Sequence, residues 1–195
     1  MSQITVKESS DELNPAVAVP ASAVGPTKTR WKASDYIAIA IATWGVGYLP
    51  LMPGTFGSLV GVGIFWLLIQ TTGGVVRITA VFLSVVIISI CGIWAATRTE
   101  ELAGRKDPGK VVVDEVAGQM LALLPLTFLT SNPTIAAVTL SFTLFRCFDI
   151  VKPYPAGRLE RLKGGFGIMC DDLVAGAYAA IIVSVLLAIP GLPIY

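Results

Sequence analysis

The chain has 195 residues, of which 54% are hydrophobic and only 14% are charged, and its mean hydropathy is +0.76. Soluble domains carry roughly 25% charged residues, so this composition indicates an integral membrane protein. The net charge of +1 gives no sign of a nucleic-acid-binding surface, and the lack of histidine excludes a Ser-His-Asp triad and a histidine-ligated zinc site.

The predicted elements are all helices. Residues 1–33 are rich in proline, serine and threonine and are expected to form a disordered tail before a helical membrane domain at 34–195. The first apolar segment is about 21 Å long at 1.5 Å per residue, which is marginal for crossing a bilayer. We therefore expect an all-α fold, a compact multi-helical integral membrane protein with about five transmembrane or re-entrant helices. The apolar segments predict helices at 35–48, 56–72, 76–97, 115–130, 134–148 and 172–189.

Turn signals between these helices predict where the charged residues lie. A Gly-Gly pair follows residue 72 and a Ser-Asn-Pro sequence follows residue 130, so two helix pairs are each expected to cross the membrane and return. All thirteen acids and every basic residue except Arg77 then lie on one face, provided that 35–48 does not cross. The excess of lysine and arginine predicts that this face is cytoplasmic. The acids can then converge on one pocket.

A segment rich in glycine and proline, GVGYLPLMPGTFGS at 45–58, precedes the second predicted helix. Thr55 is predicted to cap that helix, with Ser58 in its first turn. Free N–H groups at a helix start attract phosphate, so Gly54, Thr55, Gly57 and Ser58 are candidates for binding a phosphate group. The alternative is a bent connection between two membrane helices with a threonine cap.

Adjacent acids stand at the predicted starts of two uncharged helices. Asp114 and Glu115 open one, while Asp171 and Asp172 follow a glycine-rich loop and open the other. Each pair could simply complement a helix dipole, which is worth about 0.3–1 kcal/mol per acid. Because Asp149 follows a third apolar helix, a shared site for a hard cation such as Mg²⁺ explains the pattern better.

Asp149 also belongs to a regularly spaced set of charges. Arg146, Asp149 and Lys152 are three residues apart, so they share a helix face, and Pro153 then ends the helix. One interpretation is a structural Arg146–Asp149 ion pair. The other places Asp149 on a metal and Arg146 and Lys152 on phosphate oxygens.

Four segments in this order resemble phosphatidylglycerophosphatase A, a bacterial membrane-lipid phosphatase. They are GVGYLPLMPGTFGSL (45–59), VVVDEVAGQMLAL (111–123), FRCFDIVKPYPAGRLE (145–160) and GGFGIMCDDLVAGAYA (164–179). The resemblance implies an all-helical, Mg²⁺-dependent enzyme of the bacterial inner membrane. It also implies the reaction, which is hydrolysis of phosphatidylglycerophosphate to phosphatidylglycerol and phosphate in phospholipid biosynthesis.

A mechanism can be outlined for this chemistry. Without a histidine, a cysteine followed six residues later by arginine, or an Asp-x-Asp phosphatase motif, we expect metal-activated water to attack phosphorus directly. An aspartyl-phosphate is the alternative. Arg146 and Lys152 would neutralise the departing phosphoryl group. The candidate catalytic residues and ligands for one or two Mg²⁺ ions, one of which could act instead as general base, are Asp114, Glu115, Asp149, Asp171 and Asp172.

Two other classes of membrane protein have a comparable composition. A small ion-coupled carrier or metal transporter also places acids at broken helices, but it should carry polar groups near the membrane midplane. No uncharged segment of this chain has an acid near its middle. A structural subunit whose acids only cap helices is the other alternative. The recurrence of acids beside apolar helices favours the enzyme.

Overall fold

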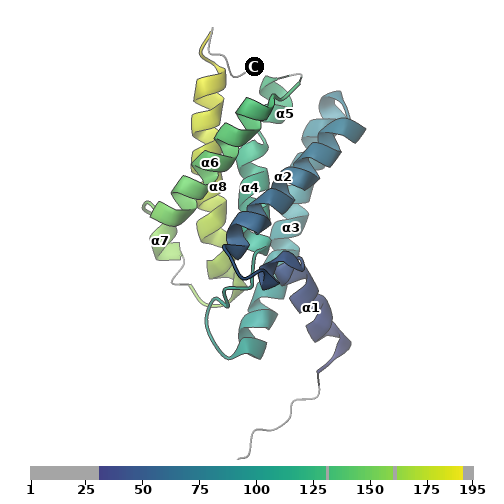
Figure 1. Ribbon diagram of the computed structural model, residues 1–195, viewed down its shortest axis with the longest axis vertical. Coiled ribbons are helices and arrows are strands. Elements are labelled where there is room, and N and C mark those ends of the chain that lie inside the picture. Colours follow the sequence, from purple (N-terminus) through teal and green to yellow (C-terminus); the bar gives the residue numbers. More distant parts are fainter. Residues whose placement is uncertain (1–30, 131, 160–161, 191–195) are drawn as a thin grey trace, which may run out of the picture. The chain divides into compact units, whose positions relative to one another are not determined.

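A computed structural model of the protein describes residues 31–130, 132–159 and 162–190 (Figure 1). The predicted tail, residues 1–33, lies outside these ranges except for its last three residues. Every regular element in the described ranges is helical, which confirms the predicted all-α fold. The elements are α1 (Ala33–Thr43), the 3₁₀ helix η1 (Val46–Tyr48), α2 (Pro53–Thr71), α3 (Gly74–Ala103), α4 (Val113–Leu123), α5 (Leu126–Leu129), α6 (Ile135–Val151), α7 (Ala156–Leu159) and α8 (Gly165–Leu187).

Three of the described helices, α2, α3 and α8, are long and apolar enough to cross a membrane. α3 has 30 residues, so it is about 45 Å long at 1.5 Å per residue, whereas the hydrocarbon core of a bilayer is roughly 30 Å thick. Because α3 is longer than the core, its charged C-terminal turns can extend beyond the lipid. The length and composition of these helices support the prediction of an integral membrane protein.

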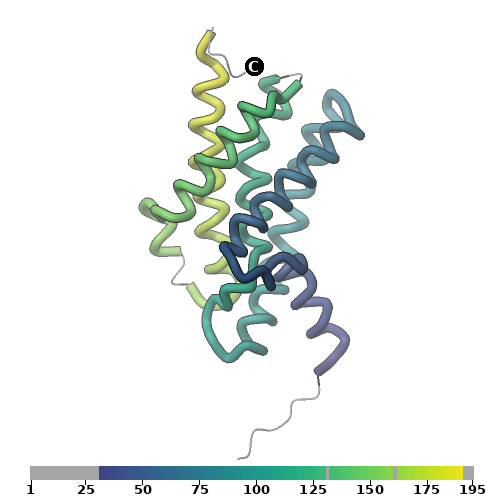
Figure 2. The backbone as a smooth tube through the Cα atoms, viewed as in Figure 1, coloured from purple at the N-terminus to yellow at the C-terminus, as the bar shows by residue number. Residues whose placement is uncertain are grey.

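α4 is the central helix of this bundle. It packs against α8, α2, α3 and α6, and nine of its eleven residues are buried. Since it has neighbours on nearly every side, α4 is apolar on most of its faces, which is typical of a buried helix. Figure 2 traces the backbone and shows α4 between α2 and α8. The acids at the start of α4 therefore lie inside the protein.

The first apolar segment forms the short helix α1 and the turn η1. With 11 residues, α1 is about 16 Å long, too short to cross. It packs along α3, where Arg98 Nε donates to Asp35 Oδ1 at 2.8 Å, and Asp35 Oδ2 accepts from the Lys32 N–H at 2.9 Å. The Arg98 guanidinium and then the Lys32 N–H hold the pKa of the Asp35 carboxyl below its ordinary value. This half-buried ion pair fixes α1 to the end of α3.

Two predicted helix starts are wrong. α2 begins at Pro53, with Met52 as N-cap, so Thr55 is not its cap. Proline suits the first position of a helix because the N–H that it lacks would have no partner there. α8 begins seven residues before the predicted start, which puts Asp171 and Asp172 in its second turn.

The early start of α8 has a clear physical cause. Gly165 donates its N–H to Thr97 Oγ1 at 2.8 Å, and a Cβ atom there would overlap the carbonyl oxygen of Ile93. The glycine-rich sequence is therefore the first turn of a helix packed on the backbone of α3. In the same way, the predicted helix 115–130 divides into α4 and α5 at Pro125, because proline cannot continue the hydrogen-bond pattern.

Candidate active site

Two glycines bring α4 and α8 into direct contact. A Cβ atom on Gly118 would lie 2.6 Å from the carbonyl oxygen of Asp172, and a Cβ atom on Gly176 would overlap the carbonyl oxygen of Gly118. The two backbones can approach this closely only because both positions lack a side chain. Asp114 and Asp172 each precede one of these glycines by four residues. The crossing therefore places the two acids opposite each other, one turn away.

A second set of glycines packs α2 against α4. A Cβ atom on Gly57 would lie 2.9 Å from the Val112 carbonyl oxygen. One turn earlier, a Cβ atom on Gly54 would overlap Glu115 Oε1. Gly54 and Gly57 thus leave space for α4 and for the Glu115 carboxylate. Their predicted contact with phosphate stays a prediction.

Three acids form the centre of the site. Carboxylate oxygens of Asp114, Glu115 and Asp172 lie within 4.8 Å of one another. Asp114 is 8% exposed and Asp172 is 3% exposed. Asp114 Oδ1, Glu115 Oε2 and Asp172 Oδ2 are buried and have no hydrogen-bond partner among the described residues. Like charges at this separation repel one another strongly in a protein interior, so the cluster needs protons or a bound cation.

The other two predicted ligands, Asp149 and Asp171, adjoin this centre, and each is paired with a basic side chain. Arg146 forms an ion pair with Asp149, and Lys152 Nζ donates to Asp171 Oδ2 at 2.7 Å. Asp149 and Asp171 line the same cavity as Asp114 and Glu115. The structure thus brings all five predicted acids together, and the Arg146–Asp149 pair is present at the edge of their cluster.

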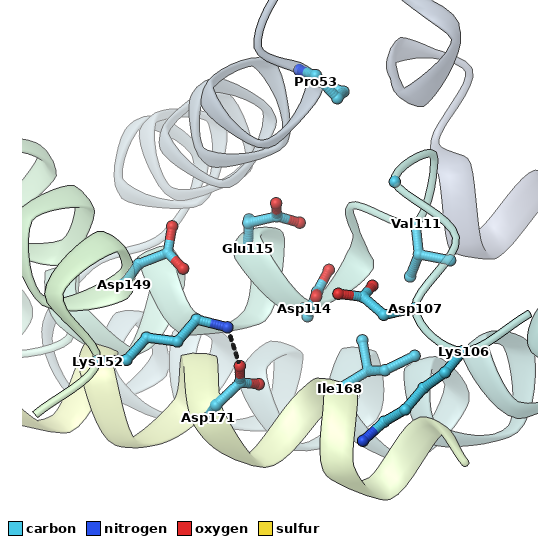
Figure 3. Close-up of a pocket in the computed structure, with 11 residues that line it drawn as sticks. Pro53, Lys106, Asp107, Val111, Asp114, Glu115, Asp149, Lys152, Ile168 and Asp171 are labelled. Carbon is cyan, nitrogen blue, oxygen red and sulfur yellow. Dashed lines mark hydrogen bonds and ion pairs between the residues drawn. The ribbon is translucent and has the colours of Figure 1, made fainter. Parts of the chain in front are cut away.

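A cavity of about 240 Å³ opens beside these carboxylates (Figure 3). Water occupies roughly 30 Å³ per molecule, so the cavity has room for a phosphoryl group and several waters. α2, α4, α6, α8 and the connection between α3 and α4 all contribute to its wall. The lining residues include Pro53, Lys106, Asp107, Asp114, Glu115, Asp149, Lys152 and Asp171.

The residues predicted to bind phosphate differ in their access to this cavity. Lys152 lines it, whereas Thr55, Gly57 and Ser58 are not among the lining residues. The Thr55 N–H donates to the Met52 carbonyl at 3.0 Å, and Ser58 Oγ accepts from Arg146 at 3.5 Å. Ser58 therefore contacts the Arg146 guanidinium and does not line the cavity. Of these residues, Lys152 is best placed to contact a phosphate group. For each of them the phosphate contact stays a prediction.

Sequence reasoning missed Asp107. Its carboxylate points toward Asp114 across the cavity (Figure 3). Asp107 has a φ of 44°, and two other residues at the cavity, Met52 before Pro53 and Lys152, have φ values of 48° and 47°. Positive φ is uncommon outside glycine and tends to occur at functional sites. The available signal was the Asp-Pro-Gly sequence at 107–109, which is equally typical of an ordinary turn.

The donor set fits a hard divalent cation. Every candidate ligand is a carboxylate, and Mg²⁺ prefers oxygen ligands from one or two carboxylates together with water and phosphate. Among the described residues that line the cavity there is no sulfur or imidazole ligand, which a softer metal would require. The unpartnered oxygens of Asp114 and Asp172 are the observation that supports a bound cation.

Residues 39–187 match the family profile of phosphatidylglycerophosphatase A. The chain belongs to the phosphatidylglycerophosphatase A family. All four segments that suggested this family lie within the matched residues. The family assignment made from the sequence is therefore confirmed.

Two individual relatives carry the name of this family, and a third carries another name. A phosphatidylglycerophosphatase A from Haemophilus influenzae is 36% identical over 141 residues, 72% of this chain and 82% of its own length. One from Escherichia coli is 34% identical over 155 residues, 78% of this chain and 84% of its own length. A Bacteroides thetaiotaomicron protein named "Putative phosphatidylinositol-3-phosphatase" is 37% identical over 159 residues, 79% of this chain and 96% of its own length. No solved structure matches.

Membership of the phosphatidylglycerophosphatase A family makes this chain a phosphatase, a hydrolase of phosphoric monoesters. Its three candidate spans place that phosphatase in a membrane. The enzyme, and not the ion carrier, is thus the class that the comparisons support.

Proposed function

We propose that this phosphatidylglycerophosphatase A relative removes the terminal phosphate of phosphatidylglycerophosphate, giving phosphatidylglycerol and phosphate in phospholipid biosynthesis. The observation that carries the proposal is the cluster of buried carboxylates with unpartnered oxygens beside a cavity of about 240 Å³. The names of the Haemophilus and Escherichia relatives support this substrate.

Mg²⁺ is the cofactor that the acids best support. Asp149 and Asp171 already have basic partners, so Asp114, Glu115 and Asp172 would hold the cation most directly. When bound, Mg²⁺ neutralises phosphate oxygens and lowers the pKa of water. Its predicted involvement rests on the carboxylate donor set and the buried unpartnered oxygens.

The side chains around the cavity suggest the remaining roles. Lys152 Nζ is held at the cavity by Asp171, where it can neutralise charge that develops as the phosphate ester breaks. Arg146, anchored by Asp149 and Ser58, adds positive charge at the edge of the acid cluster. One of the five carboxylates can act as general base in place of binding the cation and accept the proton of the attacking water. No covalent intermediate is required by this arrangement.

The surface beside the cavity suits a lipid substrate. Leu51 is 74% exposed and Met52 is 63% exposed, and both immediately precede Pro53, which lines the cavity. Acyl chains can therefore remain in an apolar environment while the head group reaches the acids. The excess of lysine and arginine on the face that carries the acids supports a cytoplasmic orientation of the active site in a bacterial inner membrane.

A second substrate is suggested by the name of the Bacteroides relative, phosphatidylinositol 3-phosphate. Both lipids carry a phosphomonoester beyond a phosphodiester, so the same acids and bases could act on either. The choice between them depends on the group that links the two phosphates.

The deciding experiment measures phosphate release by the purified protein in detergent micelles, with Mg²⁺ or with EDTA. The lipids are phosphatidylglycerophosphate, phosphatidylinositol 3-phosphate, phosphatidate and lysophosphatidate. We expect Mg²⁺-dependent release from phosphatidylglycerophosphate at the highest kcat/KM. Preference for the inositol lipid would change the substrate, and equal release with EDTA would contradict the cation. Absence of release from every lipid by folded protein would refute the proposed reaction.

A further inference from the structure

The charges at the cavity exceed what one divalent cation can neutralise. Arg146 and Lys152 pair with two of the carboxylates, and Lys106 also lines the cavity. At least three negative charges remain, and a phosphomonoester brings about two more near neutral pH. One Mg²⁺ would therefore leave the substrate facing a net negative site. The carboxylates concerned are Asp107, Asp114, Glu115, Asp149, Asp171 and Asp172.

Asp114 stands between two groups of acids. Its carboxylate lies within 4.8 Å of those of Glu115 and Asp172. Asp107, on the α3–α4 connection, lines the same cavity as Asp114. Figure 3 shows Glu115 and Asp107 on opposite sides of Asp114. Asp114 is 8% exposed, and its Oδ1 has no hydrogen-bond partner in the part of the chain that the structure describes. This is the position from which one carboxylate can contact two cations.

We propose that Asp107 and Asp114 hold a second divalent cation, with Asp114 bridging it to the cation held by Glu115 and Asp172. The proposal rests on the proposed metal-dependent function and extends it by one ion and one ligand. In two-metal phosphatases, ions about 3.5–4 Å apart bind both the attacking and the leaving oxygen. Two divalent ions would also balance the excess carboxylate charge before substrate binds.

The two cation positions differ in their surroundings. Glu115 and Asp172 belong to α4 and α8, and Asp172 is 3% exposed. Asp107 is exposed and belongs to the irregular connection between α3 and α4, with its backbone at a φ of 44°. A ligand on an exposed connection is less well held in place than one between packed helices. The second cation should therefore bind more weakly and exchange with solvent more readily.

The test measures how many Mn²⁺ ions bind to the purified full chain in detergent without substrate. Mn²⁺ replaces Mg²⁺ because it can be detected by electron paramagnetic resonance. We expect two Mn²⁺ per chain, one tight and one at least tenfold weaker, with a spectrum that shows coupling between them. Asp107→Asn should lose the weaker ion and the coupling but keep the tight ion, which also shows that the variant is folded. Glu101→Gln, which removes an exposed acid near the end of α3, should keep both ions.

The possible results separate this proposal from the proposed function. A single Mn²⁺ on the wild-type chain would overturn the second site and leave the metal-dependent phosphatase in place. Two coupled ions on Asp107→Asn would equally overturn the role of Asp107. Binding of no Mn²⁺ by a folded wild-type chain would refute both the second site and the Mg²⁺ dependence.

Discussion

The carbonyl oxygen of Gly118 occupies the space that a Cβ atom on Gly176 would need, so α4 and α8 touch backbone to backbone. This contact sets the separation of Asp114 and Asp172, which lie one helical turn before the two glycines. The geometry of the acid cluster therefore depends on residues that carry no functional group.

Gly176→Ala should separate α4 from α8 and weaken the acid cluster. Adding one carbon to so close a contact is expected to destabilise the protein by about 1–3 kcal/mol. We expect a lower Tm, and a loss of activity greater than the fraction unfolded explains, because Asp114 and Asp172 move apart. Gly63→Ala on α2 is the control, since nothing lies within 4 Å of its Cβ position. Full activity in folded Gly176→Ala would contradict this account of the site.

Asp149→Asn, Asp171→Asn and Asp172→Asn should each lower kcat by about 100-fold or more while the protein remains folded. Each change removes a negative charge from the cluster that is proposed to hold Mg²⁺ and the attacking water. Phosphate release at saturating Mg²⁺, measured beside the Tm, separates chemistry from folding. A variant that keeps a near wild-type rate would remove that acid from the mechanism.

Asp35→Asn provides the matched control for these acids. Asp35 is also a buried carboxylate paired with arginine. Its partner is Arg98, near the C-terminal end of α3, and Asp35 does not line the cavity. We expect a lower Tm from the weakened ion pair and unchanged kcat in the folded fraction. A kcat loss comparable to that of Asp171→Asn would mean that any buried ion pair, and not the cavity, controls the rate.

Lys152 combines a functional amine with a left-handed backbone. Lys152→Ala should lower kcat by about tenfold to 100-fold, less than the acid variants, because it removes one charge and leaves the proposed cation. Lys152→Gly should lose as much activity but be more stable than Lys152→Ala, since glycine adopts a φ of 47° without strain. Comparison of kcat and Tm for the two variants tests both roles. Wild-type activity in either variant would exclude the amine from catalysis.

We expect Leu51 and Met52 to help bind the lipid substrate and not to affect the rate of phosphate hydrolysis. The double change Leu51→Ser and Met52→Ser removes two exposed apolar side chains beside Pro53. We expect a severalfold higher KM for long-chain phosphatidylglycerophosphate in vesicles and an unchanged rate with a short-chain, water-soluble analogue. An equal loss with both substrates would show that these residues support the cavity itself.

Much of the fold and part of the site could be predicted from the sequence. The lengths of the apolar segments are local properties, and they sufficed for an all-helical membrane protein. The five acids of the cluster were also found because charge beside long apolar segments is rare and costly. The ion pair between Arg146 and Asp149 is one of the two interpretations that their spacing of three residues on one helix allowed.

The tertiary structure decided what depends on residues far apart in the chain. Gly165 begins α8 because Ile93 and Thr97 lie against it, so a sequence that resembles a loop is helical. Gly54 faces Glu115, and Asp107 faces Asp114, for reasons that no local pattern contains. The sequence by itself determined that the apolar segments form helices and which five acids lie beside them. Only the packing of α2, α4 and α8 determined which groups meet, because close backbone contact depends on the absence of a side chain on both partners at once.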